Sequence, residues 1–182
     1  IEWDTQEVKC PGERIKKVRR IHTPDEFDMS DGAVPKERRD KDVAIIELEE
    51  PVKIKPLRLP KDATELTKLL NQKPLKCEAH GYGTDGTGKL GNPNSALIPI
   101  QWDYRQLSLL RSPNTAMKVG DSGAGLVCRI KGKTVVIGVY QGNGKRDSKD
   151  PYVEGTATFA TLGSTLDWVQ SIVSRRSRPH KS

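Results

Sequence analysis

The sequence predicts an all-β protein, and three observations on its 182 residues support that fold class. Hydrophobic residues make up 34% of the chain and gather into short runs. Gly, Pro, Asn and Asp separate these runs, as is typical of short antiparallel strands in a barrel or a sandwich. No run reaches the length of about 18 apolar residues that a membrane-spanning helix needs, so we expect no membrane span.

The first part of the chain predicts two strands on either side of a charged loop. Residues 14–22 carry three β-branched apolar residues, each three positions from the next. A helix would fit that spacing alone, but β-branched residues favour a strand. Residues 23–41 are rich in Pro, Asp and charge and predict a loop. Residues 42–48 begin with an acid, continue with apolar residues and predict a buried strand.

The rest of the chain predicts a longer series of strands that ends in a helix. Residues 62–71 read as a polar linker with some helical character. Apolar runs bounded by turn residues predict further strands at residues 75–83, 96–100, 106–110, 126–130, 134–140 and 156–161. Near the C-terminus, Leu166, Val169 and Val173 would line one face of a short helix.

A glycine-rich turn, Gly120-Asp121-Ser122-Gly123, presents one hydroxyl and then runs into a buried strand. A serine that attacks a carbonyl needs backbone packed closely around it, because main-chain N–H groups hold the developing oxyanion. Here those donors would be the N–H groups of Gly120 and Ser122. Glycine permits such close approach and the backbone angles that it requires. From this stretch alone, a plain surface turn is the alternative.

Four further segments accompany this turn in a defined order along the chain. They are Ile21-His22-Thr23-Pro24, residues 42–48, Cys77-Glu78-Ala79-His80-Gly81-Tyr82-Gly83, and Leu166-Asp167-Trp168-Val169. In type and order, these segments and the Gly-Asp-Ser-Gly turn resemble the chymotrypsin/trypsin-like serine proteases over nearly the whole chain. The resemblance implies two six-stranded antiparallel β-barrels and a C-terminal helix, with the first barrel incomplete in this chain.

The resemblance also implies how the chain divides. Residues 1–65 would form the incomplete N-terminal barrel. Residues 66–174 would form the C-terminal barrel and its terminal helix, and residues 175–182 a basic tail.

Catalytic roles follow from the same resemblance. Ser122 matches the nucleophile, and Asp42 matches the carboxylate that orients a histidine base. The N–H groups of Gly120 and Ser122 match the oxyanion hole. Asp121 matches the zymogen-switch acid, which pairs with a new N-terminal amine on activation. Because a buried carboxylate is costly without a partner, we expect a positive group to reach Asp121.

The chain departs from the family at the histidine base. None of its three histidines, His22, His80 and His180, lies in an Ala-His-Cys-like motif. His22 instead matches a structural position that ends a strand. We therefore expect an upstream chain or segment outside this sequence to supply the base, with Cys10 as the candidate link to it.

Substrate binding is implied at four residues. Ala116 would lie at the base of the primary specificity pocket, with Gly142 and Ala157 along its walls. The Tyr140-Gln141-Gly142 stretch would offer its backbone edge to an extended peptide, where the family has Ser-Trp-Gly. Because none of these residues is an acid, we expect cleavage after apolar or small side chains and not after Arg or Lys.

The cysteines and the charge suggest where the protein is found and what it binds. Cys77 and Cys128 match two positions that the family commonly bridges, which would place the protein outside the cell or in another oxidising compartment. The net charge of +7 gathers in clumps, which are either solvated loops or a surface for a polyanion such as a sulfated glycan. Nucleic acid is disfavoured because few aromatic residues interleave the cations. We expect no metal and no cofactor.

Two functions therefore follow from the sequence. The first is a serine endopeptidase of trypsin-like fold, secreted as a zymogen. The alternative is a catalytically inactive serine-protease homologue that acts as a binding or regulatory module. The histidine departure and an Ala124-Gly125 pair in place of the usual Gly-Pro motivate that alternative.

Overall fold

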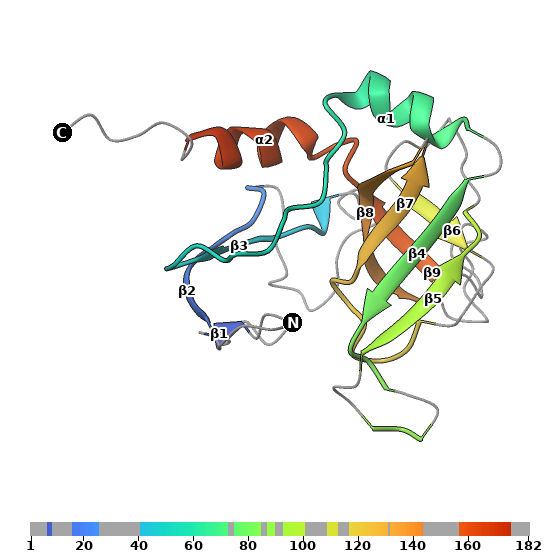
Figure 1. Ribbon diagram of the computed structural model, residues 1–182, viewed down its shortest axis with the longest axis horizontal. Coiled ribbons are helices and arrows are strands. Elements are labelled where there is room, and N and C mark those ends of the chain that lie inside the picture. The colour runs from blue at the N-terminus through green and yellow to red at the C-terminus, as the bar shows by residue number, and fades with distance from the viewer. Residues whose placement is uncertain are drawn as a thin grey trace.

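The chain forms two antiparallel β-sheets and two short helices in its computed structural model (Figure 1). The structure describes residues 7–8, 16–25, 41–72, 75–84, 87–89, 93–100, 109–112, 117–130, 132–143 and 157–175. Within these residues the predicted all-β class is confirmed. None of the helices described there is long and apolar enough to cross a membrane.

The smaller sheet contains three strands in the order β1-β2-β3, namely β1 (Glu7–Val8), β2 (Lys16–His22) and β3 (Ile45–Leu48). β3 begins at Ile45, later than the sequence predicts. The reason lies in its partner strand, because the last pair of the ladder joins His22 to Ile45. Pro24 follows soon after and has no N–H group to continue the ladder, so residues 42–44 leave the sheet.

The larger sheet contains six strands. They are β4 (Lys76–Gly81), β5 (Asn94–Ile98), β6 (Leu109–Ser112), β7 (Gly125–Ile130), β8 (Lys133–Asn143) and β9 (Ala157–Thr161). They pair in the order β5-β4-β7-β8-β9-β6, all antiparallel. The sheet is curled, so that β4 and β5 cross in front of β6 and β9 in Figure 1. Among the described strands neither sheet closes into a barrel, and the two-barrel architecture remains a prediction.

Helix α1 (Ala63–Leu70) connects the two sheets and belongs to the core of the larger one. The Asp62 carboxylate caps it by accepting the Glu65 N–H at 2.7 Å. Its leucines, Leu66 among them, pack in one buried cluster with β-strand residues such as Ile137 and Phe159. The predicted boundary between residues 65 and 66 falls inside this helix.

Helix α2 (Leu166–Arg175) ends the described part of the chain. Leu166 and Val169 are buried as predicted, but the Val173 side chain is 55% exposed. The apolar face is therefore one turn shorter than the sequence suggests. In Figure 1 both helices lie along the same edge of the molecule, above the strands.

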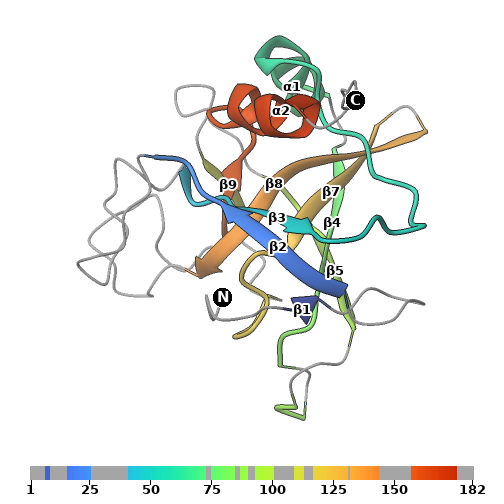
Figure 2. The same ribbon diagram turned by 90° about the vertical axis from the view of Figure 1, so that its left-hand side faces the viewer.

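The crossing segment between the sheets is held against the larger one. The Val136 N–H donates to the Arg58 carbonyl at 3.0 Å, and the Gln170 amide donates to the Lys61 carbonyl at 2.6 Å. Figure 1 shows β2 and β3 to one side of the larger sheet, and in Figure 2 they are seen in front of β7 and β8. These contacts join residues 58 and 61 of the crossing segment to β8 and α2.

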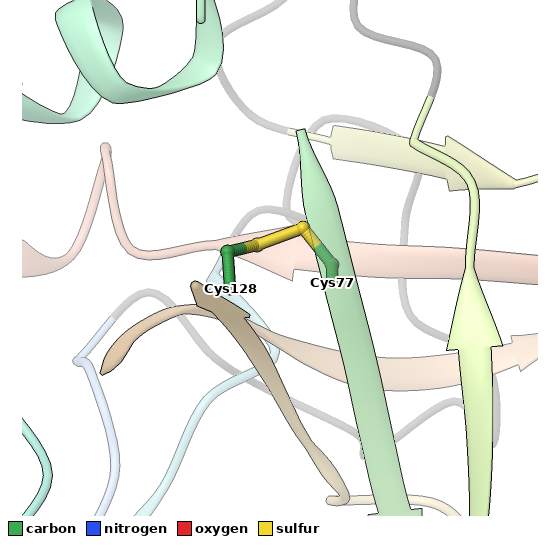
Figure 3. The surroundings of a disulfide bond; sticks show 2 residues. All are labelled: Cys77 and Cys128. Carbon is green, nitrogen blue, oxygen red and sulfur yellow. A yellow bond between two sulfur atoms is a disulfide. The ribbon is translucent and has the colours of Figure 1, made fainter. Parts of the chain in front are cut away.

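A disulfide joins Cys77 of β4 to Cys128 of β7, as the resemblance implied (Figure 3). The two residues are directly opposite in the β4–β7 ladder, and the sulfur atoms are 2.00 Å apart. Both side chains are buried in the core of the larger sheet. The bond therefore links the strand that begins this sheet to the strand that follows the Ser122 turn.

We expect the double variant Cys77→Ala/Cys128→Ala to lose about 2–4 kcal/mol of unfolding free energy, because the cross-link restricts the unfolded chain. Urea unfolding with and without a reductant measures this. The oxidised wild-type protein should lose a similar amount on reduction, whereas the variant should not respond to reductant. A variant as stable as the oxidised protein would contradict this role for the bond.

Candidate functional site

The turn that carries Ser122 is joined to strand β8 by the two residues that follow the serine. The Gly123 N–H donates to the Tyr140 carbonyl at 2.9 Å, and the Tyr140 N–H donates to the Ala124 carbonyl at 2.8 Å. Gly120 and Gly123 have φ angles of 92° and 89°, which residues with a Cβ rarely adopt. This backbone places the Ser122 side chain at the surface, where it is exposed.

The two candidate oxyanion donors lie on the same turn. Among the described residues, neither the Gly120 N–H nor the Ser122 N–H donates to another backbone group. Two neighbouring N–H groups do have backbone acceptors. The Asp121 N–H donates to the Lys118 carbonyl, and the Ala124 N–H donates to the Asp121 carbonyl. The turn thus combines an exposed hydroxyl with two N–H groups that the backbone does not use, as an oxyanion hole requires.

Asp121 is almost fully buried beneath this turn, with 6% of its surface exposed. The Gly83 N–H donates to its Oδ1 at 2.8 Å, and the Lys118 N–H donates to its Oδ2 at 2.7 Å. Hydrogen bonds from N–H groups to a carboxylate are charge-assisted and strong. In the described part of the chain these two backbone donors meet the carboxylate, and no cationic side chain forms an ion pair with it.

The Asp121 carboxylate explains two glycines of the Gly81-Tyr82-Gly83 motif. A Cβ at Gly81 would lie 2.0 Å from Asp121 Oδ1, and a Cβ at Gly83 would lie 2.6 Å from Asp121 Cγ. Either distance is far below van der Waals contact. The carboxylate therefore occupies the space that these glycines leave open at the end of β4.

Tyr140 packs beside this carboxylate. Its ring centroid is 5.4 Å from that of Phe159, and its side chain is buried in the core. Burial, together with the negative charge of Asp121, raises the pKa of Tyr140 to about 12. Tyr140 is thus a neutral core residue whose backbone holds the Ser122 turn.

Asp42 reaches the larger sheet from the end of the smaller one. The Gln141 Nε2 donates to Asp42 Oδ2 at 3.2 Å. Burial raises the pKa of Asp42 above its ordinary value, and the hydrogen bond from Gln141 partly opposes that rise. Asp42 is therefore a half-buried carboxyl group whose charged form has a neutral amide as a donor.

Gln141 can reach Asp42 because it is the extra residue of a β-bulge. In the β8–β9 ladder, Tyr140 pairs with Phe159, and the next pair joins Gly142 to Thr158. Gln141 falls between these pairs, and a residue in that position is often turned away from the regular alternation. Gln141 is not one of the site residues predicted from the sequence. Its signal is a polar residue that follows the apolar run of β8 directly before a glycine.

Asp42 and the Ser122 turn are therefore attached to neighbouring residues of β8. Asp42 is bonded to the side chain of Gln141, and the turn is bonded to the backbone of Tyr140. Asp42 and the turn that contains Gly120, Asp121 and Ser122 are thus connected through these two residues of β8.

The described histidines form contacts elsewhere. His22 Nε2 lies 3.1 Å from Glu47 Oε2 across the β2–β3 pair, and His80 Nε2 lies 3.4 Å from Glu78 Oε2 on β4. His22 ends β2, as the sequence predicts for a structural residue. His180 and Cys10 lie outside the described residues. The donor that the structure gives to the Asp42 side chain is Gln141.

The residues expected to bind substrate differ in their surroundings. Tyr140 and Ala157 are both buried in the core of the larger sheet. The Gly142 carbonyl accepts the Thr158 hydroxyl at 2.9 Å, and a Cβ at Gly142 would meet no atom within 4 Å. Space for a ligand atom is therefore open beside Gly142. Ala116 lies outside the described residues.

The charge clusters that suggested a polyanion partner are described only in part. On β2, the Lys16 amine lies 3.2 Å from the Glu50 carboxylate, and the Arg19 guanidinium lies 3.6 Å from that of Glu47. Two cations of this strand thus have acidic neighbours, and polyanion binding stays a prediction. In the described ranges, no three His, Cys, Asp or Glu side chains are grouped to hold a metal ion.

Replacing Gly83 tests the packing around Asp121. We expect Gly83→Ala to lose about 1–3 kcal/mol of unfolding free energy, because its Cβ must displace the buried carboxylate. Gly125→Ala is the matched control, since a Cβ there meets only Val136 Cγ1, at 3.9 Å. Urea unfolding of both variants measures the difference. Equal losses would show that the carboxylate does not depend on the space at Gly83.

Replacing Asp42 tests the electrostatic cost of its burial. Because burial raises the pKa of Asp42, the folded protein loses stability as the pH rises through that pKa. Asp42→Asn stays neutral and can still accept from Gln141, so it should be more stable than the wild-type protein at pH 7. The difference should vanish below the ordinary value of 3.8, where both states of Asp42 are protonated. Urea unfolding between pH 3 and pH 7 measures this. A variant less stable than wild type at pH 7 would contradict the expected sign.

The chain was compared with protein-family models and with curated proteins. The chain matches no protein-family model, and a search of curated proteins finds no match. Membership of the trypsin-like family is therefore a proposal that rests on the motifs, their order and the contacts described above.

Proposed function

We propose that this chain carries the nucleophile and the orienting carboxylate of a serine endopeptidase of trypsin-like fold. The observation that supports it best is the attachment of Asp42 and the Ser122 turn to adjacent residues of β8. A triad needs its hydroxyl and its carboxylate on opposite sides of one imidazole, so both must be held in one place. The two sheets would then be the described parts of two β-barrels.

In the proposed reaction, Ser122 Oγ attacks the carbonyl carbon of the scissile peptide bond. An imidazole from a segment outside this sequence takes the hydroxyl proton and passes it to the leaving amine. Asp42 accepts the other N–H of that imidazole and stabilises its charged form. The Gly120 and Ser122 N–H groups bind the oxyanion, which is supported by their having no backbone acceptor among the described residues.

The proposed substrate is a peptide or protein cleaved after an apolar or small side chain. Gly142 and Ala157 offer no charge to a basic side chain, and Gly142 has open space beside it. An extended peptide would lie along the backbone edge near Gly142. The Cys77–Cys128 disulfide is compatible with a secreted protein or with another oxidising compartment.

A second candidate is an inactive homologue that acts as a binding or regulatory module. The observation that favours it is the set of histidine contacts, since His22 and His80 each lie beside a glutamate and Asp42 has an amide donor instead. Without a base, Ser122 would keep only the small residual rate that an oxyanion hole provides.

Covalent labelling separates the two functions. A fluorophosphonate probe should label Ser122 in the full-length gene product, and Ser122→Ala should abolish that labelling. Ser95→Ala is the control, because Ser95 is also exposed and lies on β5, outside the site. Peptide mapping of the labelled protein identifies the modified residue. Absence of labelling under conditions that label an active serine protease would favour the inactive homologue.

A further inference from the structure

We propose that Gln141 is a positioning residue for Asp42. Its amide holds the carboxylate at a defined place beside the Ser122 turn. This inference rests on the proposed function, because Asp42 needs such positioning only if it orients a base. The family resemblance does not supply this role for Gln141, since the family has a Trp at this position and a Trp side chain carries no amide.

The side chain of Gln141 owes its direction to the β-bulge in β8. In a regular strand, the side chains of Tyr140 and Gln141 would point to opposite faces of the sheet. The bulge between the pairs Tyr140–Phe159 and Gly142–Thr158 interrupts that alternation at Gln141. Its side chain reaches Asp42, which precedes β3, and Oδ2 of Asp42 accepts its N–H at 3.2 Å.

The backbone that carries Gln141 is held by hydrogen bonds at both neighbouring residues. Tyr140, directly before it, donates its N–H to Ala124 and accepts from Gly123, so both of its peptide groups are fixed to the Ser122 turn. Gly142, directly after it, is tied to β9 through the Thr158 hydroxyl. The backbone of Gln141 is thus held on both sides. Asp42 and the Ser122 turn are therefore both bonded to the same stretch of β8.

The group that donates to Asp42 is the neutral side-chain amide of Gln141. A neutral amide can stabilise a carboxylate by one hydrogen bond without cancelling its charge, which a Lys or Arg would do. Asp42 therefore keeps the negative charge that an imidazolium requires. One of its oxygens is occupied by Gln141, and the remaining lone pairs of the carboxylate can accept the N–H of a base.

Three full-length variants test the contact directly. Gln141→Met removes the donor at similar size, and Gln141→Glu replaces it with a like charge. Gln170→Met is the matched control, since the Gln170 amide donates to the Pro60 and Lys61 carbonyls instead. The readout is the titration of the Asp42 side-chain carboxyl by carbon NMR, assigned through the loss of its signal in Asp42→Asn.

The proposal expects a higher Asp42 pKa in Gln141→Met and a higher one still in Gln141→Glu, because each change disfavours the charged carboxyl. Gln170→Met should leave the titration as in the wild-type protein. An Asp42 titration that is the same in Gln141→Met as in wild type would overturn the proposal.

The rate of fluorophosphonate labelling gives a second readout that concerns positioning. Gln141→Met should label on the order of 10- to 100-fold more slowly than wild type, as displaced catalytic groups do, while Gln170→Met should not. A shifted titration with an unchanged labelling rate would also overturn the positioning role. If wild type is not labelled at all, the proposed protease function fails, and the titration alone still decides whether Gln141 holds Asp42.

Discussion

The buried carboxylate of Asp121 is the interaction on which the Ser122 turn depends. Two backbone N–H groups, those of Gly83 and Lys118, hold it at 2.8 and 2.7 Å. One donor follows the end of β4 and the other lies just before the turn, so the carboxylate joins the segment after β4 to the segment that leads into the turn. A buried charge held this way is costly to disturb, because either donor would be left without an acceptor. The glycines at positions 81 and 83 are a consequence, since no larger residue leaves room for the carboxylate.

Strand β8 extends this arrangement to the smaller sheet. Its Tyr140 backbone receives the Ser122 turn on one side, and its Gln141 side chain receives Asp42 on the other. The core beneath is rigid, because Tyr140 packs on Phe159 and the Cys77–Cys128 bond joins β4 to β7. Two segments that are distant in sequence are thus bonded to the same stretch of β8.

Much of the larger sheet could be predicted from sequence because each strand depends on local signals. The β7–β8 hairpin is an example, since two apolar runs are separated by Gly132, whose φ of 75° suits a tight turn. The start of β3 could not be predicted, because it depends on where its partner β2 ends. The contact of Asp42 with Gln141 could not be predicted from the sequence either. It joins residues 99 positions apart and depends on a single-residue bulge that apolar periodicity does not reveal.

Ionisation of Asp42 has a free-energy cost that its surroundings offset only in part. Burial disfavours its charged form, and the hydrogen bond from Gln141 and the charge of the N-terminal amine oppose that effect. The seam between the sheets is already joined without any charge by the backbone hydrogen bond between Val136 and Arg58. A neutral side chain at position 42 would therefore serve the seam at least as well. A half-buried carboxyl group that is bonded to an amide is therefore one of the features on which we base the proposed role of Asp42.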